Sequence, residues 1–252
     1  PWTIPANRAV AYGAGLAYVL VEVRAVADGS LARPGERLLV AASRLADMAR
    51  AAGITDHRLL LQLVGEALAG TELAHPLSGL AGGYRFAVPM LPADFVSGEE
   101  GTGLVHVAPS HGTDDFELGQ KYGLEVPDTV AADGTYTEAV PGFAGIHVFE
   151  AEKPVVEALI AREALLARGQ LRHSYPHSWR SKAPLIFRAT DQWFIPMDGP
   201  YGLRAKALAA IDATRWIPES GRARIRAMVE NRPDWCISRQ RAWGVPIAVF
   251  VH

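Results

Sequence analysis

The sequence has almost no cysteine, no long apolar run and no internal repeat. Cys236 is the single cysteine among 252 residues, which excludes an internal disulfide and a cysteine-rich zinc site. The absence of disulfides is typical of proteins in a reducing compartment. No apolar run approaches the roughly 20 residues of a membrane span, and the start Pro1-Trp2-Thr3 is neither a signal peptide nor a natural start. We therefore expect a piece of a longer, cytoplasmic protein with no membrane partner.

The composition is ordinary for a globular protein, but the charges are unevenly placed. Hydrophobic residues make up 49% and charged residues 21% of the chain. Residues 94–138 hold ten acidic residues and one basic residue, whereas residues 162–241 hold fifteen basic and seven acidic residues. A basic C-terminal third favours a surface that faces phosphates, although solvated helix faces give similar counts.

The stretch Gly101–Phe116 organises the chain. Residues 104–107 form a short apolar run interrupted only by His106, which predicts a buried strand. After a turn, Thr113 is a good N-cap, and Asp115 lies in the first turn of a helix that we expect to end near Gly123. The helix N-terminus favours an ionised Asp115, which suits it to hold an ammonium group. The alternative is a capped helix and a strand histidine bonded only to backbone.

Many short strands and a few helices predict an α+β fold. A doubly wound sheet would need regular alternation of strands and helices, so the pattern favours a barrel or an α+β mixture. We expect an α+β fold with a β-barrel-type domain and surrounding helices. The boundary is expected near His177, which gives domains 1–177 and 178–252. The expected strands are 17–23, 37–41, 58–64, 66–75, 84–90, 185–190 and 193–197; the expected helices are one capped by Ser43 and ended by Gly53, the longest one at 152–168, and two at 202–211 and 220–230.

Four motifs together resemble the isoleucyl-tRNA synthetases, a family within class I. They occur in the order and with the separations of that family, and the resemblance covers essentially the whole chain. Leucyl enzymes usually carry methionine and valyl enzymes lysine where this chain has His106, which favours the isoleucyl type. The motifs are Pro1–Ala9, Gly101–Pro109, Gly112–Asp115 and Asn231–Pro246.

The resemblance implies an editing domain, 1–177, followed by a connective segment, 178–252, that returns to the Rossmann-type catalytic domain. Such a domain hydrolyses valine wrongly joined to tRNA(Ile), and valyl-adenylate, by a size sieve. One methylene is worth only ~1–3 kcal/mol of discrimination, a limit for which the isoleucyl enzymes are themselves the standard example. The implied partners are the 3′ end of tRNA(Ile) and the remainder of the synthetase chain, in a monomer. The parent ligase joins isoleucine to tRNA with ATP and Mg²⁺; this piece lacks the synthetic motifs and needs no cofactor.

The same resemblance suggests roles for four residues. Asp115 would hold the α-ammonium of the misattached amino acid, and His106 would lie beside its side chain and bar isoleucine; these two are the expected catalytic residues. Asn7 and Thr3 would complete substrate binding, Thr3 as the end of a threonine-rich segment. The structural alternatives are a core histidine and an asparagine bonded to its own backbone. Since no nucleophile arrangement stands out, we expect attack by water.

The sequence also bears on zinc binding and on two alternative functions. Some family members have two cysteines of a zinc site where this chain has Ser178 and Ser181, and hydroxyls are poor zinc ligands, so no metal is predicted. His173 and His177 lie around Pro176 without partners and predict none either. The functional alternatives are a valyl- or leucyl-type editing domain and a non-catalytic tRNA-binding module, which would leave the ester of Val-tRNA intact.

Overall fold

The chain divides into two units, Pro1–Ala189 and Thr190–His252. The computed structural model describes residues 1–170, 174–240 and 244–248. The division lies farther along the chain than the boundary expected near His177, and the functional domains 1–177 and 178–252 stay a proposal. Each unit is described here by itself.

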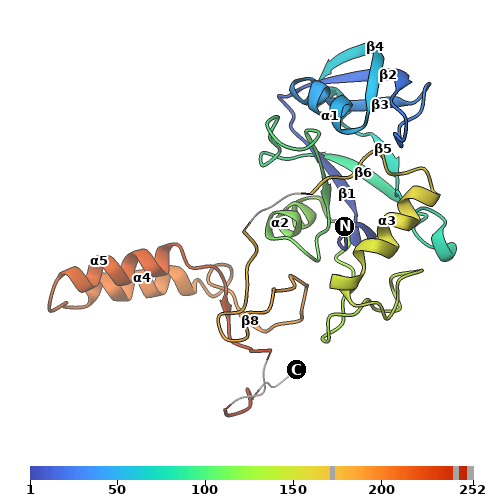
Figure 1. The fold of residues 1–252 in the computed structure, drawn as a ribbon. Coiled ribbons are helices and arrows are strands. Elements are labelled where there is room, and N and C mark those ends of the chain that lie inside the picture. Colours follow the sequence, from blue (N-terminus) through green and yellow to red (C-terminus); the bar gives the residue numbers. More distant parts are fainter. Residues whose placement is uncertain (171–173, 241–243, 249–252) are drawn as a thin grey trace. The chain divides into compact units, whose positions relative to one another are not determined.

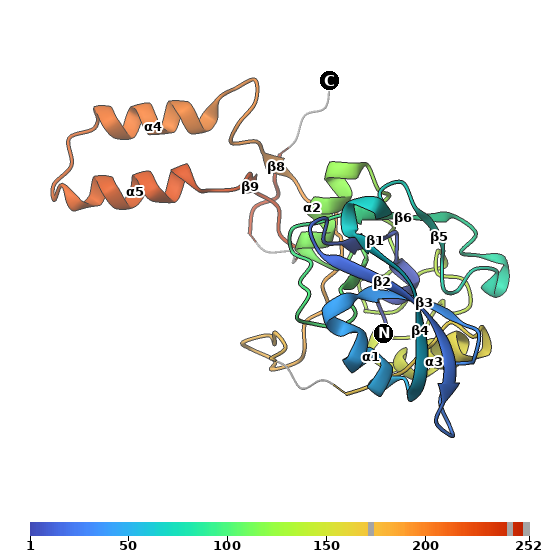
Figure 2. The ribbon, with the colours of Figure 1, turned by 90° about the horizontal axis from the view of Figure 1, so that it is seen from above.

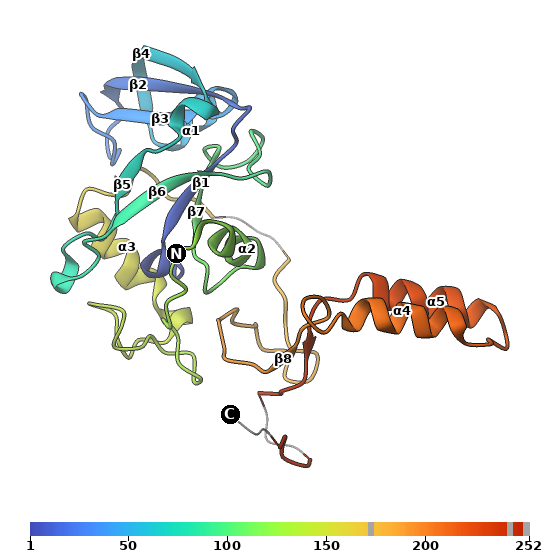
Figure 3. The same cartoon turned by 180° about the vertical axis from the view of Figure 1, so that it is seen from behind.

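A four-stranded sheet in the first unit carries the central motif. Its strand order is β5-β6-β1-β7, and β1 runs parallel to β6 and antiparallel to β7, with Val10 opposite His106. Alanines at positions 9 and 11 of β1 are fully buried, so neighbouring elements approach the centre of the sheet closely. Figure 3 shows β7 between β1 and the helix α2. The strands are Glu72–Ala74 (β5), Ala87–Pro92 (β6), Ala9–Tyr12 (β1) and Leu104–Val107 (β7).

A second sheet is antiparallel and has the order β3-β2-β4, with β2 in the centre and β4 on its far side from β3 (Figure 1). It consists of Ala17–Val26 (β2), Arg37–Ala41 (β3) and Ile54–Val64 (β4), and the helix Leu45–Ala51 (α1) packs on it through Met48 and Ala49. The two sheets share a core that includes Tyr12 and Tyr18. The hydroxyl of Tyr18 accepts a hydrogen bond from Gly13 N at 3.0 Å and donates one to Gly103 O at 2.7 Å.

The remaining elements of the first unit surround these sheets. Thr113–Tyr122 (α2) follows β7, and Glu152–Ala161 (α3) buries Val155 and Leu159 in a third core with Tyr136. The short 3₁₀ helices are Ile4–Ala6 (η1), Ala42–Arg44 (η2), Gly65–Leu68 (η3), Leu80–Gly82 (η4) and Val148–Glu150 (η5).

The second unit is a helical hairpin on a two-stranded ribbon. Leu203–Ala213 (α4) and Ser220–Glu230 (α5) lie side by side (Figure 2), and Phe194–Ile195 (β8) pairs antiparallel with Trp235–Cys236 (β9). Asp212 of α4 pairs with Arg222 and Arg226 of α5. Two arginines of the basic stretch 162–241 therefore stabilise the hairpin itself.

The α+β prediction is confirmed, whereas closure into a barrel is not found in the described residues. The strands there form two open sheets and one ribbon, and the two sheets join through the side chains of a shared core. Each sheet consequently keeps two edge strands. No helix in the part of the chain that the structure describes is long and apolar enough to cross a membrane.

Candidate functional site

The first residues of the chain return to the end of β7. The helix η1 begins after Thr3 and is capped at its C-terminal end by Asn7, whose N–H donates to Ile4 O at 3.1 Å. Asn7 is buried, and its Oδ1 accepts a hydrogen bond from Val107 N at 3.3 Å rather than from its own backbone. Thr3 Oγ1 lies 3.0 Å from His106 Nε2. Two of the four predicted residues are thus held against neighbouring positions of one strand.

Asp115 reaches the same strand end from α2. Its Oδ2 accepts a hydrogen bond from Ala108 N at 2.9 Å, and its Oδ1 has no hydrogen-bond partner among the described residues. The N-cap of α2 is Gly112, not Thr113, and a Cβ at Gly112 would come within 3.1 Å of the Asp115 carboxylate. The glycine therefore allows the carboxylate to fold back over the helix start.

Burial works against the expected ionisation of Asp115. It raises the pKa of this carboxyl above its ordinary value, and the N–H of Ala108 opposes the rise while the neighbouring Asp114 adds to it. The expectation that the helix N-terminus favours the charged form omitted this desolvation cost. A cation that approached the free Oδ1 would restore the charged form.

His106 is neutral at pH 7 and has one unpaired ring nitrogen. Burial lowers its pKa to about 4, and the nearby His111 acts in the same direction. Its Nδ1 is buried and has no partner among the described residues. Because buried polar atoms are almost always hydrogen-bonded, this nitrogen marks a place where a bound group would gain a contact.

Two further histidines contact the same N-terminal segment, and neither was predicted as a site residue. The ring of His111 lies edge-on to Trp2 at 4.8 Å and bonds Thr129 Oγ1 and Phe187 O, each at 2.8 Å. His75 Nε2 lies 3.2 Å from Ile4 O. No local pattern marks either residue, because each contact joins segments far apart in the sequence.

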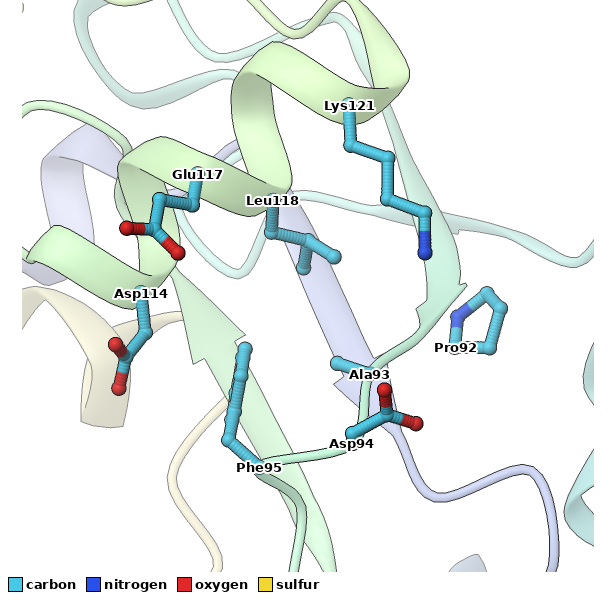
Figure 4. A pocket seen from close by; sticks show the side chains of 8 residues that line it. All are labelled: Pro92, Ala93, Asp94, Phe95, Asp114, Glu117, Leu118 and Lys121. Atoms are coloured by element: carbon cyan, nitrogen blue, oxygen red, sulfur yellow. The ribbon is translucent and has the colours of Figure 1, made fainter. Parts of the chain in front are cut away.

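The four predicted residues do not line the open pocket beside α2. That pocket has a volume of about 480 Å³ and lies between residues 92–95 and the α2 face that carries Asp114, Glu117 and Lys121 (Figure 4). Asp115 points from another side of the helix, toward β7. The candidate site is therefore the end of β7, and the pocket is separate from it.

The serines at the expected zinc positions form a local turn. Ser178 N donates to Ala183 O at 2.8 Å, and Ser181 N donates to Ser178 Oγ at 3.3 Å. His177 Nδ1 bonds Tyr175 O, and His173 lies outside the described residues. No group of three metal-ligating side chains occurs in the described ranges. The absence of zinc stays a prediction: elemental analysis of the purified chain should find none in stoichiometric amount, and one zinc per chain would contradict it.

The comparisons with known proteins agree with one another. A family model described as tRNA synthetases class I (I, L, M and V) matches residues 7–252. The isoleucine–tRNA ligase of Gluconobacter oxydans (strain 621H) is 55% identical over 263 aligned residues, and that of Pelagibacter ubique (strain HTCC1062) is 48% identical over 252. Each alignment covers 100% of this chain and 27% of the relative, so the chain spans about a quarter of their length.

A solved structure shares the fold. The chain described as the crystal structure of GlLeuRS-CP1 matches with a TM-score of 0.50, over 68% of this chain and 82% of that one, at 16% identity. At this identity the likeness concerns the fold alone.

Proposed function

Because this chain belongs to the class I tRNA synthetases (I, L, M and V), we propose that it is the editing domain of an isoleucyl-tRNA synthetase with the connective segment that follows it. The whole enzyme would ligate isoleucine to tRNA(Ile) with ATP and Mg²⁺, as the names of the relatives suggest. The piece itself would hydrolyse Val-tRNA(Ile) and valyl-adenylate. Residues 1–177 would carry this activity, and residues 178–252 would lead back to the catalytic domain.

The observation that carries the proposal is the convergence of three side chains on three consecutive positions, the first of which is His106. His106, Val107 and Ala108 contact, in that order, Thr3, Asn7 and Asp115. A carboxylate, an amide, a hydroxyl and a neutral imidazole thus surround one strand end. This set can hold an ammonium group and an ester without any metal ligand.

We assign each residue a role that agrees with its contacts. Asp115 Oδ1 accepts the α-ammonium of the misattached amino acid, while Oδ2 stays fixed on Ala108 N. His106 lies beside the amino-acid side chain and excludes isoleucine by size. Water attacks the ester carbonyl, the bond to the ribose oxygen breaks, and that oxygen takes up a proton. Thr3 and Asn7 keep the N-terminal segment in register with β7.

The test is the substitution Asp115→Ala in the full-length synthetase. Deacylation of Val-tRNA(Ile) should be lost, because the ammonium loses its charge-assisted partner, while isoleucine activation stays near normal. Asp114→Ala is the matched control, since Asp114 is an exposed carboxylate in the same helical turn. Deacylation that survives in Asp115→Ala would refute the assignment.

The basic stretch 162–241 keeps one other function open, a non-catalytic tRNA-binding module. Such a module would bind Val-tRNA(Ile) in a salt-dependent manner and leave its ester intact. Side-by-side assays with Val-, Ile- and Leu-charged tRNAs also separate the isoleucyl type from valyl- or leucyl-type editing. Hydrolysis of valine esters alone supports the proposal.

A further inference from the structure

His75 is a buried histidine that lies outside the four residues of the candidate site. It follows β5, is 2% exposed, and is one of the largest fully buried side chains in the described residues. Its ring stacks on Tyr84 at 4.8 Å and meets Phe86 edge-on at 5.4 Å. Two aromatic neighbours therefore fix the plane of the ring.

Both ring nitrogens of His75 bond backbone groups, and these partners define one tautomer. Leu77 N donates to Nδ1 at 3.1 Å, so Nδ1 is an acceptor. Ile4 O lies 3.2 Å from Nε2 and can only accept, so Nε2 carries the proton and donates. Burial lowers the pKa of His75 to about 4, which keeps this neutral form at pH 7.

The carbonyl that His75 contacts is also the one that positions Asn7. Ile4 O accepts a hydrogen bond from Asn7 N at 3.1 Å, and Asn7 Oδ1 in turn accepts one from Val107 N. One residue before Ile4, Thr3 contacts His106. His75 therefore anchors the short helix η1 between the two site residues that this segment contributes.

We propose that His75 is a positioning residue for the editing reaction, which fixes the segment Trp2–Asn7 through the Ile4 carbonyl. The inference rests on the proposed function and deepens it. Within the described residues, the ring of His75 is hydrogen-bonded to Ile4 and Leu77 and to none of the four site residues. It acts through Ile4, and a small displacement of Thr3 and Asn7 is expected to slow hydrolysis without weakening tRNA binding.

The test compares His75→Asn with His75→Gln in the full-length synthetase. Asn can keep an acceptor near Nδ1 for Leu77 but loses the donor to Ile4, whereas Gln can place an N–H near Nε2 and keep that donor. We expect kcat for Val-tRNA(Ile) deacylation to fall about 10- to 100-fold in His75→Asn and to stay within about threefold in His75→Gln. The KM and the rate of isoleucine activation should change little in both.

Tyr84→Phe is the control for general damage to this core. It removes the hydrogen bond from the Tyr84 hydroxyl to Pro141 O at 3.0 Å, next to His75, and leaves the hydrogen bond between His75 and Ile4 O in place. Equal loss of deacylation in the Asn and Gln variants, or in Tyr84→Phe, would overturn the proposal. If His75→Asn does not fold, a large loss in His75→Gln would overturn it as well, and activity near that of the parent would support it.

The Asp115→Ala variant separates the two proposals. If it loses deacylation while His75→Asn keeps it, only the positioning role fails. If Asp115→Ala keeps deacylation, the proposed function itself is wrong, and the positioning role of His75 is wrong with it.

Discussion

At the scale of single residues, His106 combines two properties that a steric barrier needs. The strand around it stays anchored without its ring, because Val107 is fully buried and His106 pairs with Val10 through the backbone. The ring itself makes one side-chain hydrogen bond, to Thr3. Its removal therefore opens space at the site and leaves the sheet in place.

We expect His106→Ala in the full-length enzyme to gain hydrolysis of correctly charged Ile-tRNA(Ile). Overpacking a tight site typically costs ~1–3 kcal/mol, which corresponds to a ten- to hundredfold preference for valine over the larger isoleucine. The measurement is deacylation of Ile-tRNA(Ile) and Val-tRNA(Ile) in parallel. Loss of both activities would instead make His106 part of the catalytic or binding machinery, and an unchanged ratio of the two rates would mean that it is not the sieve.

The sequence predicted that Asp115 would return to the end of the strand that carries His106, and its carboxylate accepts a hydrogen bond from Ala108 N there. A strand, a tight turn and a helix start favour this return whatever the rest of the chain does. The return of Thr3 and Asn7 to β7 spans about a hundred residues, and only the resemblance to a family suggested it. His75 also contacts that segment, and no sequence pattern indicated this contact.

At the scale of elements, the close approach of η3 to the β1–β2 connection depends on a glycine. Gly65 is buried, and its N–H donates to Leu16 O at 2.8 Å. A Cβ at this position would lie 2.1 Å from Gly13 O and 2.9 Å from Ala14 O. Both obstacles are backbone atoms, which cannot turn aside as a side chain can.

Gly65→Ala should therefore destabilise this chain by about 1–3 kcal/mol or more. Gly15→Ala is the matched control, since Gly15 lies in the same connection and a Cβ there meets nothing within 4 Å. Urea denaturation of both variants measures the free energy of unfolding. If the two variants unfold at the same urea concentration, the close approach does not contribute to stability.

Element positions were predicted better than element ends. The strand Arg37–Ala41 and the helix Ser220–Glu230 have the bounds expected from sequence, but the helix expected at 152–168 ends at Ala161, so it is shorter than α4 and α5. Glu163 has a positive φ of 58°, and the next apolar pair divides: Leu165 packs in the core of α3 and Leu166 in the core of the second sheet. Packing in two cores overrides helix periodicity there.

The predicted helix cap at Ser43 and the predicted strand at 185–190 were wrong for a related reason. Ser43 lies in η2 and donates to Gly98 O at 2.7 Å instead of capping α1. Residues 185–190 form no strand; Arg188 donates to Val130 O, and Phe187 O bonds His111. In both places a long-range hydrogen bond replaces the local one that the sequence pattern favours.

At the scale of the whole molecule, the first unit holds three histidines around one short segment: His75 is buried, and His106 and His111 are partly buried. Burial lowers the pKa values of His75 and His106 to about 4 and lowers that of His111 below its ordinary value of 6.5. In the unfolded chain all three would titrate near 6.5. The folded state therefore requires neutral rings, and acid should lower its stability because these rings become protonated on unfolding.

The sign of this effect follows from counting bound protons. Above pH 6.5 neither state protonates these rings, so their full contribution to stability is present. Between pH 6.5 and about 4 the unfolded chain binds protons that the folded chain does not, and stability falls as the pH falls. Asp115 acts in the opposite direction, since its raised pKa favours the folded state at low pH.

We therefore expect the free energy of unfolding of this chain to decrease from pH 7 to pH 5. Each fully buried histidine contributes a slope of up to about 1.4 kcal/mol per pH unit within the window. Urea titrations at pH 7, 6 and 5 measure it, and His75→Gln should flatten the profile by up to one histidine's share. His57→Gln, at an exposed position of β4, controls for the loss of a histidine elsewhere. A stability that stays constant over this range, or a His75→Gln profile parallel to that of the parent, would mean that the rings take up protons inside the fold and that their burial does not hold them neutral.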